Sequence, residues 1–191
     1  MMYKILKKEI LSDTVKLMDV YAPHVARNAR AGQFVILIID EHGERIPLTI
    51  ADYNKGTGTI TIIFQELGKS TMQLGRLKPG DAIASFAGPL GHPTEIENYG
   101  TVVCMGGGVG IAPIYPIARS LKEAGNSVIS IIGARNKELL FWEDKMRTVS
   151  DELIVCTDDG SHGRKALVTE PLKELFERKD KKVARVWAIG P

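Results

Sequence analysis

Residues 101–113 read Thr-Val-Val-Cys-Met-Gly-Gly-Gly-Val-Gly-Ile-Ala-Pro, and this stretch decides the fold of the second half of the chain. Residues 101–105 predict an apolar strand and residues 111–124 predict a helix, so the glycines lie at a strand-to-helix turn. Glycine accepts positive φ and has no Cβ, so a pyrophosphate can approach the amides at the helix N-terminus. Pro113 suits the first turn of that helix. The stretch therefore predicts a βαβ unit with a nucleotide site at its turn.

Strands and helices continue to alternate toward the C-terminus. Strands are expected at 127–132, 153–156 and 183–189, and helices at 138–149 and 166–178. This alternation predicts a Rossmann-like α/β domain over residues 98–191, with a parallel sheet covered on both faces. No helix follows the last strand. We therefore expect this domain to be C-terminally incomplete, so that a longer natural chain or another polypeptide completes its surface.

Residues 1–97 have a different pattern. Short segments rich in β-branched residues lie at 14–21, 33–39, 58–64 and 81–86, separated by turn-forming residues, and one helical stretch is expected at 69–77. Regularly spaced short strands predict an antiparallel sandwich or a small barrel. The chain is thus expected to form two domains.

Composition excludes several classes of function. The 191 residues are 44% hydrophobic and carry 25 basic and 23 acidic side chains, so no strong field would attract nucleic acid or an anionic membrane. No apolar run approaches the roughly 20 residues of a membrane span. The N-terminus lacks the pattern of a secretory signal, so a cytoplasmic location is expected.

Cysteine and histidine usage argues against a metal site. Cys104 and Cys156 each lie at the end of an apolar strand and are expected to be small buried residues. The four histidines show no metal-ligand spacing. No metal site and no Ser-His-Asp triad are predicted.

The nucleotide-binding half leaves alternatives open. The glycine cluster departs from the Gly-x-Gly-x-x-Gly pattern because Pro113 replaces the last glycine, and a tight turn without a ligand is the alternative. Arg135 stands where an acidic residue would hold the adenosine ribose; it is either a ligand of a 2′-phosphate or a solvated loop charge. NAD and NADP are both compatible. Asp158, Asp159 and Gly160 would border the same crevice, or form only an Asx turn.

The first half contains two candidate flavin motifs. Arg45-Ile46-Pro47-Leu48-Thr49 places a guanidinium for phosphate oxygens four residues before a hydroxyl that can bond a flavin ring nitrogen. Gly68-Lys69-Ser70-Thr71 opens a helix with the chemistry of a second anion site. A simple helix cap is the alternative for this second motif.

Six motifs in order resemble the ferredoxin-reductase superfamily. They are Arg-x-Pro-Leu-Thr, Gly-Lys-Ser-Thr-x-x-Leu, Lys-Pro-Gly-Asp at 78–81, Gly-Pro-Leu-Gly at 88–91, Gly-x-Gly-x-Ala-Pro at 108–113, and Thr-Asp-Asp-Gly-Ser at 157–161. Within it, the chain is similar to the electron-transfer subunits of the dihydroorotate dehydrogenase type. It is also similar to the small (alpha) subunits of NADH-dependent ferredoxin:NADP oxidoreductase, or sulfide dehydrogenase. The resemblance spans essentially the whole chain.

The resemblance implies a fold and a set of cofactor ligands. Residues 1–97 would form a six-stranded antiparallel β-barrel that binds FAD, and residues 98–191 would bind NAD(P). The implied FAD residues are Arg45, Pro47, Leu48, Thr49 as a contact of flavin N5, Gly68, Lys69, Ser70, Thr71 and, unless it is only a core aromatic, Phe64. The implied NAD(P) residues are Gly106, Gly107, Gly108, Val109, Gly110, Ala112, Pro113, Arg135, Asp158, Asp159 and Gly160.

The resemblance also implies an activity. The chain would take hydride from NAD(P)H through FAD and pass electrons to a partner, forming a hetero-oligomer with a larger catalytic oxidoreductase subunit or serving ferredoxin. Family members continue into a cysteine-rich segment that binds a two-iron two-sulfur cluster, so this cluster is expected only if the native chain extends beyond residue 191. A non-catalytic nucleotide-binding assembly or sensor subunit and a free-standing flavin reductase are the alternatives.

Overall fold

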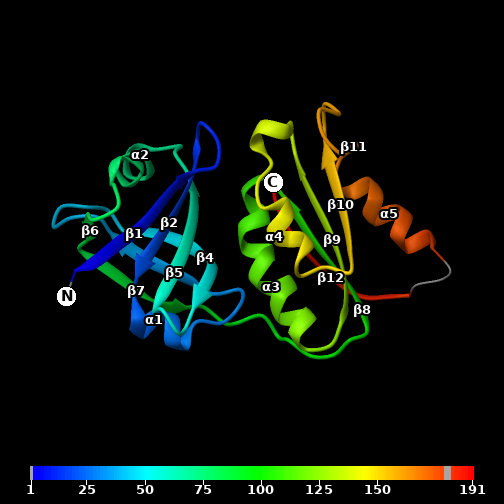
Figure 1. The fold of residues 1–191 in the computed structure, drawn as a ribbon, viewed down its shortest axis with the longest axis horizontal. Helices are drawn as coiled ribbons and strands as arrows, with labels where there is room; N and C mark the ends of the chain where they lie inside the picture. Colours follow the sequence, from blue (N-terminus) through cyan, green and yellow to red (C-terminus); the bar gives the residue numbers. More distant parts are fainter. Residues whose placement is uncertain (1, 179–181) are drawn as a thin grey trace. The chain divides into compact units, whose positions relative to one another are not determined.

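The computed structural model describes residues 2–178 and 182–191 and divides into two compact units, Met1–Thr94 and Glu95–Pro191 (Figure 1). Each unit has its own sheet, and the two sheets are of different kinds. The first sheet is antiparallel throughout and the second is parallel throughout.

The first unit is a strongly curved antiparallel sheet. Its strands follow the order β6-β1-β2-β5-β4-β3-β7. They are β1 (Tyr3–Ile10), β2 (Val15–Tyr21), β3 (Phe34–Ile38), β4 (Ile46–Asn54), β5 (Thr59–Gln65), β6 (Ala82–Ile83) and β7 (Ser85–Leu90). Two helices join them, α1 (Pro23–Asn28) and α2 (Lys69–Arg76).

The sheet has seven strands where six were expected, because the last stretch bends at Ala84. Ala82 and Ile83 pair with β1 at one edge, whereas residues 85–90 pair with β3 at the other. At the bend the Ala84 amide donates to the Ile39 carbonyl at 3.1 Å. One continuous stretch thus meets both edges and nearly closes the sheet, so the predicted barrel is confirmed and its strand count is corrected.

Alternating apolar residues fill the inside of this barrel. In β3, Val35 and Leu37 are fully buried while their neighbours are half exposed, as the period of a strand requires. The short helix α1 was not expected from the sequence. It begins with Pro23 in its first turn and adds the buried Val25 and Ala26 to the core.

The second unit is the predicted parallel α/β domain. Its sheet has the order β11-β10-β9-β8-β12. The strands are β8 (Thr101–Gly107), β9 (Ser127–Ala134), β10 (Glu152–Thr157), β11 (Arg164–Lys165) and β12 (Val183–Ile189). The helices are η1 (Gly108–Gly110), α3 (Ile111–Glu123), η2 (Lys137–Leu139), α4 (Glu143–Arg147) and α5 (Thr169–Glu177). Helices α3 and α4 cover one face of the sheet and α5 covers the other (Figure 1).

The second unit differs from expectation in one helix and contains one strand that was not expected. The helix expected at 138–149 is broken into η2 and α4, because Trp142 has a left-handed backbone with φ of 59° that no helix continues through. The two-residue strand β11 was not expected. It adds a parallel edge to β10 directly after the loop that carries Asp158 and Asp159.

Within residues 2–178 and 182–191, none of the helices combines the length and the apolar character that a bilayer crossing requires.

Candidate functional site

Strand β4 and Arg45, the residue before it, present three of the predicted flavin residues on one face. Arg45, Pro47 and Thr49 are exposed, and they alternate with the buried Ile46 and Ile50. Because strand side chains alternate between faces, these three point outward from the barrel. The structure therefore brings Arg45, Pro47 and Thr49 together.

Leu48 and Phe64 belong to the interior of the same barrel. Leu48 is half buried and packs against the barrel core from the opposite side of β4. Phe64 is 2% exposed and lies within that core. Phe64 thus has the packing role that the sequence offered as its alternative, and the open face of β4 is formed without it.

The neighbouring strand adds an aromatic residue that the sequence reasoning missed. Phe34 pairs with Thr49 on one side and with Leu90 on the other. Its half-exposed ring lies on the same outward face, and a Cβ added to Gly91 would meet that ring at 3.0 Å. Only the pairing register places Phe34 beside Thr49, so the strand pattern alone could not identify it. The Phe34 ring and Thr49 thus form an apolar surface with a hydroxyl at its edge.

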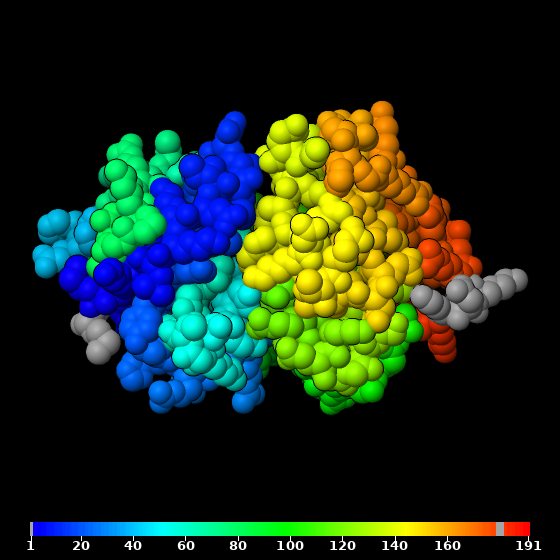
Figure 2. All heavy atoms as spheres, in the orientation of Figure 1, coloured from blue at the N-terminus to red at the C-terminus, as the bar shows by residue number. Residues whose placement is uncertain are grey.

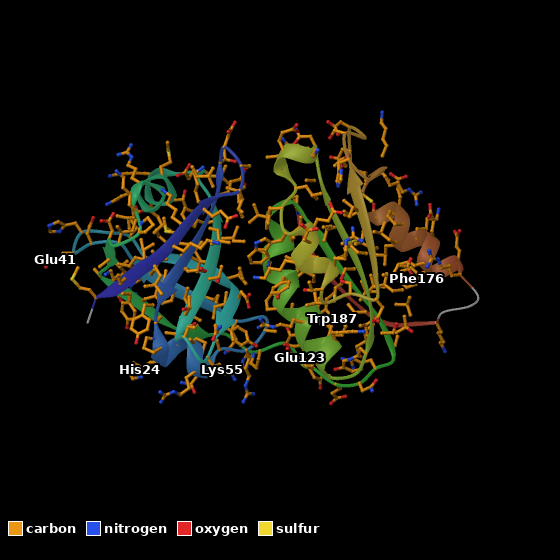
Figure 3. All side chains as sticks on the ribbon, in the orientation of Figure 1. His24, Glu41, Lys55, Glu123, Phe176 and Trp187 are labelled. Atoms are coloured by element: carbon orange, nitrogen blue, oxygen red, sulfur yellow. The ribbon has the colours of Figure 1, made fainter. Side chains whose placement is uncertain are left out.

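Helix α2 begins beside the loop that leads to Arg45. The Ser70 hydroxyl donates to the carboxylate of Glu44, and the Gln73 amide donates to Asp40 at 2.7 Å. Both acceptors lie in the loop between β3 and β4, whose tip carries Glu41 (Figure 3). The first turn of α2, with Gly68, Lys69, Ser70 and Thr71, is thereby held next to the residue preceding Arg45.

Thr71 caps this helix, and Gly68 leaves open space in front of it. The Thr71 hydroxyl oxygen accepts from the Gly68 and Leu67 amides, both at 3.1 Å. Gly68 has an extended backbone with φ of −138°, and a Cβ added to it would meet no atom within 4 Å. Neither conformation nor packing requires glycine here. The free space and the positive end of the helix fit an approaching phosphate.

The glycine-rich turn of the second unit contains glycines of two kinds. A Cβ on Gly106 would lie 2.9 Å from the Ile111 Cα, and a Cβ on Gly110 would lie 2.7 Å from the Ile189 carbonyl carbon. These two glycines allow the strand and helix backbones to pack closely. Gly108 differs, because its φ is +54° and a Cβ there would meet no atom within 4 Å. The turn is therefore open to a ligand at Gly108.

The residues around Gly108 differ in how far they are exposed, which the sequence did not specify. At Gly107 the nearest atom to an added Cβ is 3.8 Å away, in ordinary contact. Val109 and Pro113 are half exposed, whereas Ala112 is buried with 2% exposure under the start of α3. Val109 and Pro113 are thus partly accessible, as Gly107 and Gly108 are.

The other predicted nucleotide residues lie at the same edge of the sheet. The registers pair Gly107 with Gly133 and Ala134 with Thr157, so β8, β9 and β10 end together. The Asp158 amide donates to the Ala134 carbonyl at 3.1 Å, and the Asp159 amide donates to the Arg135 carbonyl at 3.2 Å. The structure thereby places Arg135, Asp158, Asp159 and Gly160 together beyond the carboxyl ends of β9 and β10.

The two aspartates of this loop differ. Asp159 accepts from the Ser161 amide at 2.9 Å and from its hydroxyl at 2.6 Å, which is an Asx turn. These hydrogen bonds hold the pKa of Asp159 below its ordinary value. Asp159 therefore forms the Asx turn that the sequence offered as an alternative, and its part in nucleotide binding stays a prediction. The exposed Asp158 side chain is the better placed of the two to meet a ligand.

A surface hollow of about 440 Å³ lies next to this loop, around α4. Its lining includes Phe141, Trp142, Glu143 and His162. His162 bonds Glu143 at 2.7 Å; burial raises the pKa of Glu143, but the bonds from His162 and Arg147 outweigh it and leave the pKa lowered. The segment that contains α4 is coloured yellow at the surface of its unit in Figure 2. Sequence reasoning missed this hollow, and one of its lining residues is Trp142, whose backbone is left-handed.

Neither cysteine is available for chemistry. Cys104 and Cys156 are free thiols with exposures of 0% and 1%. They lie on β8 and β10, which are separated by β9. Within the part of the chain that the structure describes, no group of three or more His, Cys, Asp or Glu side chains could hold a metal ion.

Burial of Cys104 predicts a loss of stability in alkali. Burial raises the pKa of its thiol from 9.0 to about 12. Between these values the unfolded chain releases a proton that the folded chain retains, so stability is full below pH 9.0 and falls as pH rises toward about 12. The expected slope from this group is about 1.4 kcal/mol per pH unit. Urea unfolding of the native chain and of Cys104→Ala from pH 8 to 10.5 measures it, and equal slopes in both proteins would contradict the prediction.

Comparison with known proteins gives a consistent result. No family model matches the chain. It is 46% identical, over 98% of its length, to the dihydroorotate dehydrogenase B (NAD(+)) electron transfer subunit homolog of Thermotoga maritima, covering 66% of that protein. It is 31% identical, over 96% of its length, to the dihydroorotate dehydrogenase B (NAD(+)) electron transfer subunit of Fusobacterium nucleatum, covering 72% of that protein.

A solved structure agrees with these relatives. All of the chain matches 68% of one chain in the structure of an NADH-dependent reduced ferredoxin-NADP oxidoreductase, with a TM-score of 0.92 and 44% identity. Phthalate dioxygenase reductase, with a TM-score of 0.76 and 20% identity, shares the fold. The chain spans about two thirds of the length of the curated relatives that it matches first. This chain belongs to the family of dihydroorotate dehydrogenase B electron transfer subunits, which has the fold of the ferredoxin reductases.

Proposed function

We propose that this chain is an FAD-dependent electron-transfer subunit that takes hydride from NAD(P)H and passes electrons to a partner subunit or an iron–sulfur cluster. One observation carries the proposal. Each unit contains a helix N-terminus with a glycine that packing does not require, Gly68 in the first and Gly108 in the second, and each opens onto free space. The names of the relatives support electron transfer, and two anion sites suit two dinucleotides.

FAD is assigned to the first domain, residues 1–97. The Arg45 guanidinium and the first turn of α2, with Gly68, Lys69, Ser70 and Thr71, would hold the pyrophosphate by charge and by backbone amides. Pro47, Thr49 and Phe34 would provide the surface for the flavin ring, with the Thr49 hydroxyl bonding near N5. Leu48 supports this surface from inside the barrel, and the buried Phe64 supports it only through the core.

The nicotinamide nucleotide is assigned to the second domain, residues 98–191. The amides around Gly107 and Gly108 and the positive end of α3 would hold its pyrophosphate, while Gly106, Gly110 and Ala112 keep the turn close to the strand. Val109 and Pro113 would flank the ligand. Asp158, with Arg135 and Gly160, would meet the adenosine end.

The residues bind and orient, and the cofactors supply the chemistry. Bound FAD provides an acceptor for the hydride of NAD(P)H and can release electrons singly. The side chains assigned here include no covalent nucleophile. Their tasks are to fix the two ring systems and to set the charge around them.

A spectrum tests the proposal most directly. The purified protein, loaded with FAD if necessary, should be yellow and should bleach when NADH is added without oxygen. A protein that cannot be loaded with FAD would support a nucleotide-sensing or assembly subunit instead. Rapid turnover of free flavin with no partner protein would support a free-standing flavin reductase.

We further propose NADH rather than NADPH as the preferred donor. The names of the sequence relatives refer to NAD(+), and the name of the similar solved structure gives NADH as its donor beside NADP. In this chain the exposed Asp158 directly follows β10, and its backbone is bonded to Ala134, the residue before Arg135. A 2′-phosphate bound near Arg135 would therefore be repelled by the Asp158 carboxylate. Parallel anaerobic titrations with the two donors measure the preference, and faster bleaching by NADPH would contradict it.

The partner is proposed by analogy with the relatives. A larger catalytic oxidoreductase subunit is the expected partner, with ferredoxin as the other acceptor, and a two-iron two-sulfur cluster belongs to the system only if the native chain extends beyond residue 191. Co-purification from the native host identifies the partner. Iron analysis of that native complex tests the cluster.

Glu44 is expected to oppose FAD binding. Its carboxylate accepts the Ser70 hydroxyl at the N-terminus of α2, where the proposal places the pyrophosphate. Replacing Glu44 with glutamine keeps a hydrogen-bond acceptor and removes one like charge. We expect FAD affinity to rise about three- to tenfold at low ionic strength, with a smaller gain in salt. Titration of FAD fluorescence at two salt concentrations measures this, and unchanged affinity in both would contradict it.

A further inference from the structure

The N-terminus of α2 follows directly on an ion pair between Lys16 and the half-buried Glu66, whose side chains are 9% and 21% exposed. Lys16 on β2 is 7% exposed, although lysine is seldom buried to this extent. Its ammonium group lies 3.3 Å from the Glu66 carboxylate, and it donates to the Ser12 carbonyl at 3.1 Å and the Asp13 carbonyl at 2.6 Å. The Lys16 ammonium group is therefore paired with the backbone of the turn at Ser12 and Asp13 and with the Glu66 carboxylate.

Glu66 links this lysine to both ends of α2. It stands two residues before the cap residue Gly68, and its amide donates to the Thr14 carbonyl at 2.8 Å. Its side chain lies against Gly75 in the last turn, where an added Cβ would be 2.7 Å from the Glu66 Cδ and would overlap the carboxylate oxygen. The Glu66 backbone therefore fixes the entry of the chain into α2, and its carboxylate contacts the last turn of the helix.

Gly75 is unfavourable for the helix itself. Glycine in a helix interior is less stable than alanine, and Gly75 has no positive φ that would require it. The contact with Glu66 explains its presence. A second lysine, Lys8 on β1, donates to the Gly75 carbonyl and holds the same turn. Gly75 thus lowers the intrinsic stability of α2 but allows its last turn to contact Glu66 and Lys8.

We propose that Lys16, Glu66 and Gly75 are positioning residues that fix α2 so that its first turn and Arg45 meet the pyrophosphate of FAD together. This inference rests on the proposed function. Replacing a desolvated ion pair with apolar residues of similar volume is often neutral for stability, whereas removing one partner alone leaves an unpaired charge and destabilises the fold. The contacts among Lys16, Glu66 and Gly75 are therefore expected to affect mainly the positions of Gly68 and Ser70.

Three variants separate positioning from stability. Lys16→Met with Glu66→Leu replaces the pair with apolar residues, and Gly75→Ala displaces the Glu66 carboxylate while favouring the helix. Both proteins are expected to keep the thermal midpoint of the FAD-free native chain within a few degrees and to bind FAD about tenfold more weakly. Lys7→Met is the matched control, because it breaks the exposed Lys7–Glu9 pair on β1, whose side chains are 58% and 46% exposed. Its FAD affinity should not change.

The measurements are the FAD dissociation constant, from flavin fluorescence well below the melting transition, and the thermal midpoint of each FAD-free protein. A lower thermal midpoint with unchanged FAD affinity would overturn the inference, since these contacts would then contribute only to stability. Unchanged affinity in the double variant and in Gly75→Ala would also overturn it, while the proposed function would stand. A native chain that binds no FAD would overturn both. If the double variant does not fold, Gly75→Ala decides the outcome alone.

Discussion

Replacement of Arg45 with methionine is expected to weaken FAD binding about 10- to 100-fold. A hydrogen bond between charged groups contributes roughly 1.5–3 kcal/mol, and methionine keeps the aliphatic length without the charge. Arg45 is exposed beside the first turn of α2, and within the described part of the chain its guanidinium has no hydrogen bond or ion pair. The stability of the FAD-free protein should therefore change by less than about 0.5 kcal/mol.

Isothermal titration of FAD into the FAD-free protein measures this effect. Arg27→Met is the matched control, since Arg27 is an exposed arginine in the last turn of α1 in the same unit. If Arg27→Met and Arg45→Met bind FAD equally well, Arg45 does not hold the pyrophosphate. A higher salt concentration should reduce the difference between the native chain and Arg45→Met, because the lost interaction is electrostatic.

Replacement of Gly110 with alanine is expected to destabilise the second unit by about 3 kcal/mol. Gly110 has an ordinary helical backbone with φ of −61°, so alanine meets no conformational penalty there. The added Cβ would instead lie 2.7 Å from the Ile189 carbonyl carbon and overlap its oxygen. Backbone atoms of β12 cannot move aside as the end of a flexible side chain can, so the strand must shift.

Tryptophan fluorescence during urea unfolding reports on this unit alone. The chain has two tryptophans, Trp142 and Trp187, and both lie in Glu95–Pro191; Trp187 is labelled in Figure 3. Gly107→Ala is the control, because its Cβ would lie 3.8 Å from the nearest atom and should cost no more than about 1 kcal/mol. Similar midpoints for Gly107→Ala and Gly110→Ala would show that β12 yields more easily than this packing implies.

The tertiary contacts sorted residues that looked equivalent in sequence. The four glycines at 106–108 and 110 form one cluster in the sequence, yet Gly106 and Gly110 allow close backbone packing while Gly108 opens onto free space. Similarly, Leu48 and Thr49 are adjacent, but one packs against the barrel core and the other is exposed. Which face of a strand is covered depends on its neighbours, and a single sequence does not contain that information directly.

Local patterns predicted most of the order of elements, because hydrophobic periodicity and turn residues are local, although they missed α1 and β11. The sequence predicted β12 at Val183–Ile189 with its observed bounds and α3 to within one residue at its end, and it located both glycine-bearing helix starts. Tertiary structure decided the bend at Ala84 that raises the strand count, the left-handed Trp142 that divides a predicted helix, and the contacts among Lys16, Glu66 and Gly75. These features arise between residues distant in the chain, or from a backbone conformation that local propensity disfavours, so only the packed fold reveals them.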